Sequence, residues 1–173
     1  LAFVGIVLAL PIGIILALGR RSEMPIIRAL SVTYIEFWRG TPLITILFMA
    51  SVMLPLFFPS GVEFDKVVRA MIGITLFQSA YTAEAVRGGL QAIDKGQSEA
   101  AGALGMRPNF VMNLVILPQA LRVIVPPLIS FYLNITKNSS LALAVGYMDI
   151  TGTLGGITLN QTGRAIEAVL LLM

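Results

Sequence analysis

Two long stretches of this sequence contain no charged residue at all, residues 1–19 and residues 40–62. An α-helix needs about 20 apolar residues to cross the hydrocarbon core of a bilayer, where it must satisfy its own backbone hydrogen bonds. The chain as a whole is 57% hydrophobic and 12% charged, whereas a typical soluble domain is about 25% charged. The expected fold is therefore all-α, a polytopic bundle of membrane helices in a single domain that covers residues 1–173.

Hydropathy predicts four spans and the beginning of a fifth, at residues 1–19, 42–58, within 64–90, 120–136 and 165–173. Thr41 is expected to cap the second span, with Pro42 at its first helical position. Pro126 and Pro127 are expected to break or kink the fourth span, because two adjacent prolines free backbone carbonyls. Neither end of the sequence has the character of a natural terminus, so we expect a fragment that is truncated at both ends.

Two further segments are predicted to lie at the membrane surface. Residues 25–38 mix apolar and charged side chains at helical spacing, and we expect them to lie along the interface with Tyr34 and Trp38 at headgroup level. Residues 141–162 are rich in glycine and only weakly apolar. We expect this segment to form a short external or re-entrant helix followed by a loop.

The distribution of basic residues predicts the orientation of the chain. The expected inner loops carry eight basic residues, Arg20, Arg21, Arg28, Arg39, Arg87, Lys95, Arg107 and Arg122. The expected outer loops carry four, Lys66, Arg69, Lys137 and Arg164. Because cytoplasmic loops are enriched in Lys and Arg, residues 91–118 are predicted to lie in the cytoplasm.

Residues 97–118 form a polar, alanine-rich island between apolar segments. Ser98 is a candidate helix cap, and Glu99 would lie in the first turn, where a negative charge suits the helix dipole. Gly105 is placed to end the helix in a left-handed conformation, and Pro108 discourages its continuation. Such a short helix needs a surface to dock on. A face formed by the small residues Ala100, Ala101 and Ala103 would fit a groove in another protein.

The sequence contains no recognisable catalytic centre. It has no Cys or His, and it lacks GxxxxGK[ST], GxSxG, CxxC and HExxH patterns. The chain is therefore not expected to be an enzyme or to carry a cofactor or metal. If it moves solutes at the expense of ATP, the ATPase must be a separate polypeptide.

Several motifs together resemble the permease subunits of bacterial ABC importers. Glu99-Ala100-Ala101, Gly105 after three intervening residues, and the run from Val115 to Leu117-Pro118 are similar to the EAA loop of that family, with Val115 where Ile is usual. The segments YIEFWRGTPL, SAYTAEAVRGGLQAIDKGQSEAA and KNSSL resemble its polar amino acid uptake subfamily. The run LITILFMASVMLPLFFPSGVEFDK is similar to general L-amino acid permease subunits in particular.

The resemblance implies a five-helix permease core in the bacterial inner membrane that imports L-amino acids, polar or of broad range. It implies a second permease subunit, identical or paralogous, a periplasmic amino-acid-binding protein, and ATPase subunits that bind ATP and Mg²⁺. Membrane lipid would surround the chain, and no nucleic acid is involved. Residues 91–118 would form the cytoplasmic coupling loop, in which the ATPase-coupling residues are Glu99, Ala100, Ala101, Gly105, Leu117 and Pro118.

A transported amino acid is a zwitterion, so its path needs both signs of charge or helix termini. The candidates are Glu84, Arg87, Lys137, Asn138 and Ser139. Glu84 and Arg87 are three residues apart and can pair on one helix face. Alternatively, their long side chains reach the interface, and Lys137–Ser139 belong to an exposed loop. A self-contained secondary transporter or channel, with Glu84 as an ion site, is the alternative function.

Overall fold

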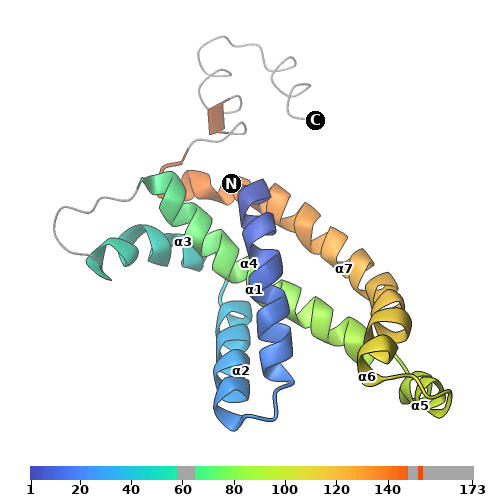
Figure 1. Ribbon diagram of the computed structural model, residues 1–173. Coiled ribbons are helices and arrows are strands. Elements are labelled where there is room, and N and C mark those ends of the chain that lie inside the picture. Colours follow the sequence, from blue (N-terminus) through green and yellow to red (C-terminus); the bar gives the residue numbers. More distant parts are fainter. Residues whose placement is uncertain (58–64, 148–151, 154–173) are drawn as a thin grey trace, which may run out of the picture.

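The computed structural model describes residues 1–57, 65–147 and 152–153, and the elements it assigns to them are helical (Figure 1). The α-helices are α1 (Ala2–Arg20), α2 (Pro25–Gly40), α3 (Leu43–Val52), α4 (Lys66–Gln91), α5 (Lys95–Ala103), α6 (Pro108–Phe110) and α7 (Leu117–Asn138). Two 3-10 helices, η1 (Leu54–Phe57) and η3 (Ser139–Val145), and one π-helix, η2 (Val111–Ile116), complete the described elements. The predicted all-α class is confirmed.

Helix α4 is the centre of the bundle, and α1 packs along it through small residues. The buried residues of α1 recur every fourth position, as Gly5, Ala9, Gly13 and Ala17. A Cβ atom added at Gly5 would lie 2.7 Å from the Ile74 side chain, and one added at Gly13 would lie 2.7 Å from Thr82. Since an eight-residue step along α1 matches an eight-residue step along α4, the two helices run parallel. Small residues allow this close backbone approach, as in membrane helix pairs.

Two clusters of buried apolar side chains attach the other helices to α4. The first joins α1, α2, α4 and α7, and its buried members are Ala17, Ile35, Ala83, Val86, Ala120 and Ile124. The second joins α3, α4, α7 and η3, and its buried members are Leu43, Leu47, Ala70, Ile74, Ile135 and Ala142. Each cluster buries side chains from α4, so this helix fixes the positions of the others.

The expected second span is shorter than predicted. Thr41 does not cap it but ends α2, where its Oγ1 donates to the Phe37 carbonyl at 2.9 Å, and Pro42 takes the N-cap position. Helix α3 is ten residues long and gives way to the 3-10 turn η1. Pro55 lies in that turn, and a proline cannot donate the backbone hydrogen bond that would continue the α-helix.

The expectation that residues 25–38 lie flat at the interface is also wrong. Helix α2 packs alongside α1 and α4. The Tyr34 hydroxyl donates to the Leu76 carbonyl at 3.2 Å and lies 2.9 Å from the Ser79 hydroxyl, so this side chain points into the bundle rather than toward headgroups. The chain therefore returns from the end of α1 to the start of α4 through two successive helices, α2 and α3.

Helix α7 continues through Pro126 and Pro127, so of the two predicted alternatives, a break or a kink, the break is wrong. The irregular backbone lies upstream, in the π-helix η2. The segment from Lys137 to Leu141, expected as a possible loop, is helical at the end of α7 and in η3. The predictions for most of residues 148–162 and for residues 165–173 fall outside the described residues.

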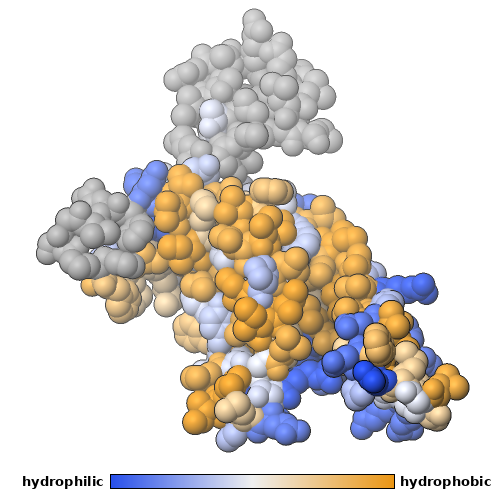
Figure 2. All heavy atoms as spheres, viewed as in Figure 1, coloured by the Kyte–Doolittle hydropathy of each residue, from blue (hydrophilic) through white to orange (hydrophobic). Residues whose placement is uncertain are grey.

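Among the described helices, two are long and apolar enough to cross a membrane, Ala2–Arg20 and the continuous helical run Pro108–Val145. Large apolar side chains are exposed along them, including Phe3 at 78%, Ile15 at 68% and Leu133 at 58%. Figure 2 shows apolar surface over the middle of the bundle, whereas hydrophilic surface is mixed with apolar patches at its lower end and around α5. This distribution suits a surface that faces lipid or other membrane subunits.

Candidate coupling helix and transport path

Helix α5 begins earlier than the sequence predicted. Asp94 is its N-cap, with Oδ1 accepting from the Gly96 amide at 2.7 Å, whereas the Ser98 hydroxyl donates to the Lys95 carbonyl inside the helix. The prediction that Ser98 is the cap is wrong, because an equally good capping residue precedes it. Glu99 consequently lies in the second turn, where the helix dipole contributes little.

The C-terminus of α5 follows the prediction. Gly105 has φ = +77°, in the left-handed region. The Met106 amide donates to the Ala101 carbonyl at 3.2 Å and the Gly105 amide donates to the Gly102 carbonyl at 2.9 Å, which together form a Schellman motif. No described atom lies within 4 Å of a Cβ built on Gly105. The backbone conformation, rather than crowding within the chain, therefore favours glycine here.

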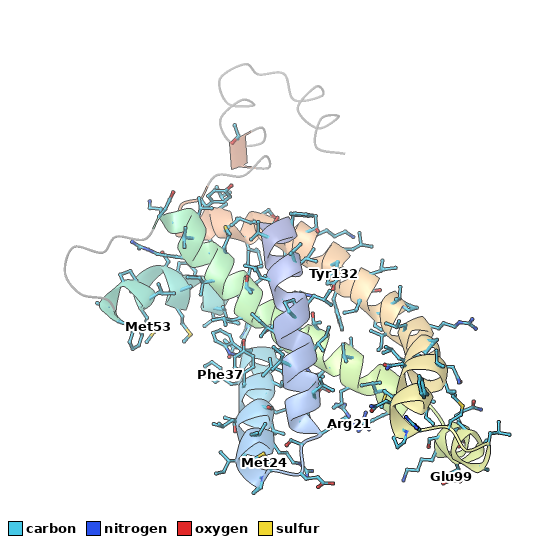
Figure 3. All side chains as sticks on the ribbon, in the orientation of Figure 1. Arg21, Met24, Phe37, Met53, Glu99 and Tyr132 are labelled. Carbon is cyan, nitrogen blue, oxygen red and sulfur yellow. The ribbon has the colours of Figure 1, made fainter. Side chains whose placement is uncertain are left out.

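The two sides of α5 differ in exposure. Glu99, Ala100 and Ala103 are exposed, and Figure 3 shows Glu99 at the outer edge of α5, away from the bundle. Ala101 is only 5% exposed and faces the chain itself. Ala101 is the one buried residue of α5, and it helps to seat the helix, so the exposed surface of α5 includes Glu99, Ala100 and Ala103 together with the other residues of the helix.

Few contacts attach α5 to the bundle. It packs on η2, and the Gln119 side-chain amide at the start of α7 donates to Gln97 Oε1 at 3.1 Å and to the Val115 carbonyl at 3.0 Å. Leu117 and Pro118 form the first turn of α7, directly beside Gln119. The predicted coupling residues thus divide between α5 itself and the helix start to which it is tied.

The Glu84 carboxylate lies at the centre of a cluster of charges that joins three helices. Its Oε1 accepts from Arg20 at 2.7 Å, and its Oε2 accepts from Arg87 at 2.8 Å and lies 3.6 Å from Arg39. Arg20 also donates to Glu36 at 3.1 Å. The Glu84 side chain is only 14% exposed. Glu84 is therefore partly buried beside its partners, and the expected pairing of Glu84 with Arg87 is confirmed.

Sequence reasoning assigned Arg20 and Arg39 to cytoplasmic loops and gave Glu36 no role. Arg20 is the last residue of α1, and Arg39 lies in the last turn of α2, so both helices end at the carboxylate carried by α4. A polarised helix C-terminus favours basic residues, which was an available signal. Their convergence on Glu84 required the packing of α1 and α2 against α4.

The remaining path candidates, Lys137, Asn138 and Ser139, lie at and just beyond the C-terminal end of α7. Lys137 and Asn138 end that helix and Ser139 begins η3, so the structure does not bring them to Glu84. Asn138 instead lines a cavity of about 190 Å³ between α4 and α7, together with Gln78, Tyr81 and Asn134. The amides of Gln78 and Asn134 were not predicted from the sequence.

The described residues contain no group of three or more acidic side chains, cysteines or histidines that would hold a metal ion. Five described charged residues pair with one another in the Glu84 cluster, namely Arg20, Glu36, Arg39, Glu84 and Arg87. Their ion pairs join α1, α2 and α4.

Comparison with known proteins identifies the class to which this architecture belongs. The family model for the binding-protein-dependent transport system inner membrane component matches residues 9–173. The chain belongs to this family. A crystal structure of an amino acid ABC transporter with histidines matches with a TM-score of 0.84 and 32% identity, over 98% of this chain and 78% of that chain.

Curated relatives carry the same kind of description. The inner membrane amino-acid ABC transporter permease protein YhdY of Escherichia coli is 54% identical over 160 residues, which cover 92% of this chain and 44% of YhdY. The glutamate/glutamine/aspartate/asparagine permease protein BztB of Rhodobacter capsulatus is 69% identical over 60% of this chain and 24% of its own length. The general L-amino acid permease protein AapQ of Rhizobium johnstonii is 55% identical over 57% of this chain and 24% of AapQ.

The chain therefore spans less than half the length of these three relatives. The resemblance to amino acid ABC-importer permeases is confirmed, and the family assignment supports a membrane subunit of an ABC importer rather than a self-contained secondary transporter or channel. The three relatives are named as permease proteins, and both the family description and the name of YhdY refer to the inner membrane, which agrees with a membrane chain.

Proposed function

We propose that this chain is the membrane-spanning part of an ATP-driven importer of L-amino acids in a bacterial inner membrane. Its partners would be cytoplasmic ATPase subunits that carry ATP and Mg²⁺, a second permease subunit and a periplasmic amino-acid-binding protein. The printed names of the relatives support amino acids as the cargo. Residues 1–173 would form one permease domain, and residues 91–118 its coupling loop.

The observation that carries the proposal is the form of α5. It is a nine-residue helix closed at both ends by its own caps, with Glu99 and Ala100 exposed. A helix this short is marginal without something to pack on. Its packing on η2 and the Gln97–Gln119 hydrogen bond connect it to α7, so a force applied to its outer face would be passed to α7.

In this mechanism, closure of the ATPase dimer moves α5 as a rigid body, and the membrane helices exchange inward- and outward-open arrangements. The Glu84 cluster lies where α1, α2 and α4 meet, so relative movement of these helices must change its ion pairs. Arg39 makes the loosest of these contacts, 3.6 Å from the carboxylate. Its guanidinium is therefore the one best placed to exchange Glu84 for the carboxylate of a passing amino acid.

The test is reconstitution of the full-length chain with its ATPase and binding protein in liposomes, with uptake and ATP hydrolysis both measured. Gly105→Arg is expected to abolish substrate-stimulated hydrolysis and to reduce uptake at least about tenfold. Gly105→Asn separates the two possible reasons, because asparagine tolerates a left-handed conformation. Gly105→Ala is the companion variant, because alanine is small but disfavours that conformation. If crowding of the docking surface is the reason, Gly105→Asn also impairs coupling. If backbone strain is the reason, Gly105→Ala impairs coupling and Gly105→Asn does not.

Normal uptake and hydrolysis in the Gly105→Arg transporter would contradict the coupling role of α5. Uptake driven by an ion gradient in the absence of ATP would contradict the proposed class of transporter.

A further inference from the structure

An apolar groove lies in the corner between α2 and α3. Thr41 is extended, as a residue before a proline prefers, and Pro42 is extended as well, so α3 leaves the end of α2 at a steep angle (Figure 1). The groove in this corner runs over α4 and has a volume of about 270 Å³. The described residues that line it carry only apolar or aromatic side chains, from Trp38 on α2 to Leu76 on α4.

The groove is closed toward α4 and open on the outside of the chain. At its base α3 and α4 are in close contact, since a Cβ atom added at Gly73 would lie 3.3 Å from the Ala50 Cβ. At its rim, Phe37, Met53 and Phe57 are 52%, 43% and 78% exposed. Figure 3 shows Phe37 and Met53 on the two arms of the corner. A partner can therefore enter the groove from the side of the bundle.

The charged side chain of Arg69 lies at one end of the groove. Its Nη1 atom donates to the carbonyl of Ser51, in the last turn of α3, at 3.0 Å. On α4, Arg69 shares a helix face with the lining residues Ile72, Gly73 and Leu76, which follow it at helical spacing. No acidic side chain among the described residues lies within ion-pair distance of this half-buried guanidinium. Its charge therefore has no counterion in the described part of the chain.

An apolar groove that ends at an uncompensated cation is complementary to an amphiphile with an anionic head and a hydrocarbon chain. A transmembrane helix of another subunit fits less well, because one helix turn occupies roughly 400 Å³ at a diameter of about 10 Å and a pitch of about 5.4 Å, which is more than the groove holds. A free amino acid also fits poorly, because the described walls offer its two charges no charged partner. Arginine and phosphate, by contrast, form strong charge-assisted hydrogen bonds.

We propose that this groove binds an acyl chain of a phospholipid and that Arg69 holds the phosphate of the same molecule. Arg69 is among the basic residues that the charge distribution predicts on the outer side, so the lipid would belong to the outer leaflet. The bound chain would fill the corner between α2 and α3 and connect both helices to α4. This inference depends on the membrane family of the chain and is independent of the proposed cargo.

The test uses the full-length transporter complex, purified in a maltoside detergent that contains no phosphate. One probe is phosphatidylglycerol with a photoreactive diazirine halfway along one acyl chain, added at low concentration. The matched probe is diacylglycerol with the same chains, which lacks only the phosphoglycerol head. After irradiation, peptide mass spectrometry measures the labelled fraction of the groove. We expect phosphatidylglycerol to label the groove about tenfold more than diacylglycerol, as a charge-assisted hydrogen bond to phosphate implies.

Arg69→Gln is expected to lower labelling by phosphatidylglycerol to the level of diacylglycerol, whereas Arg69→Lys should retain part of the difference because it keeps the charge. Lys66→Gln is the matched control. Lys66 is basic and lies one turn earlier on α4, but its Nζ atom lies 3.3 Å from a Cβ built on Gly146, at the end of η3, and it does not line the groove. Its labelling is expected to match the wild type.

Arg69→Gln also removes the hydrogen bond to Ser51, so a second variant leaves Arg69 in place. Met49 is half-buried and lines the groove, and Met49→Trp should fill the space that the acyl chain needs. We expect labelling of the groove by phosphatidylglycerol to fall about tenfold in this variant, and labelling elsewhere on the complex to stay unchanged.

Equal labelling of the wild-type groove by the two probes would overturn the inference, because the phosphate would then have no role. Absence of label from the groove with both probes would show that another subunit covers it, and would overturn the inference too. So would unchanged labelling in an assembled Arg69→Gln complex or, if that variant does not assemble, in Met49→Trp. Transport and ATP hydrolysis are not part of these readouts, so each of these outcomes leaves the proposed function standing.

Discussion

The contact between α1 and α4 and the attachment of α5 are built in opposite ways. Helix α1 lies so close to α4 that an added Cβ at Gly13 would fall 2.7 Å from Thr82 and 2.9 Å from the Ser79 carbonyl oxygen. Helix α5 rests on η2, and Cβ atoms added at Gly102 and Gly105 would meet no described atom within 4 Å. The bundle is therefore fixed by close packing, whereas α5 is fixed by its caps and one side-chain tie. A close-packed interior moves as a unit, and a lightly attached helix is free to receive a partner.

The largest loss of stability is expected from replacing Glu84, where ion pairs add to the packing of α1, α2 and α4. Glu84→Gln leaves Arg20, Arg39 and Arg87 without their shared carboxylate. Because the cluster is partly buried, the expected cost lies between the roughly 1 kcal/mol of an exposed pair and the about 3–5 kcal/mol of a fully buried one. We expect the full-length complex in detergent to unfold at a clearly lower temperature. Glu36→Gln is the control, since Glu36 is 55% exposed and such surface pairs contribute at most about 1 kcal/mol. Equal melting temperatures for the two variants would contradict the central position of Glu84.

Close packing predicts opposite signs for the same substitution at two glycines. Gly13→Ala forces α1 and α4 apart and should cost about 1–3 kcal/mol, as overpacking does. Gly88→Ala, in α4, meets nothing within 4 Å and should stabilise by up to about 1 kcal/mol through helix propensity. Thermal unfolding of the two variants measures both signs. An unchanged melting temperature for Gly13→Ala would contradict the claim that close packing of α1 on α4 fixes the bundle.

The smallest effect is expected at the tie between α5 and α7. Gln97→Leu removes the hydrogen bond to Gln119, which is worth about 0.5–1.5 kcal/mol, and should leave the global melting temperature almost unchanged. Amide hydrogen exchange in α5 should nevertheless become faster, because the helix is held locally. In a double-mutant cycle, Gln119→Leu should add little once Gln97 has been replaced. Full additivity of the two changes would show that the bond does not hold α5.

The contrast between the α1–α4 contact and α5 also explains which structural features could be predicted from the sequence. Features determined by neighbours along the chain were predicted well: the charge-free first helix, the left-handed Gly105 and the pairing of Glu84 with Arg87. The choice between neighbouring capping residues was harder to predict. Asp94 and Ser98 are both good caps, and only the folded chain shows that the helix begins at the former.

Long-range packing was the part that could not be predicted. Nothing near Arg20 or Arg39 in the sequence indicates a shared carboxylate on α4, and Tyr34 has the pattern of an interfacial residue although its hydroxyl bonds inside the bundle. The buried amide of Gln78 was hidden for the same reason. These side chains acquire their roles from helices that meet only after folding.

The most direct test of the central claim, that α5 couples the membrane helices to a separate ATPase, uses the difference in exposure between adjacent residues. Residues 1–173 contain no cysteine, so Ala100→Cys and Ala101→Cys each introduce a single thiol into this part of the chain. Ala100 is exposed and Ala101 is 5% exposed. A short thiol-reactive cross-linker is added to the reconstituted, transport-active complex. We predict a cross-link from Ala100→Cys to the ATPase whose yield changes with ATP, and little or none from Ala101→Cys. An active complex in which the Ala100→Cys thiol reacts with the reagent yet forms no link to the ATPase would contradict the claim.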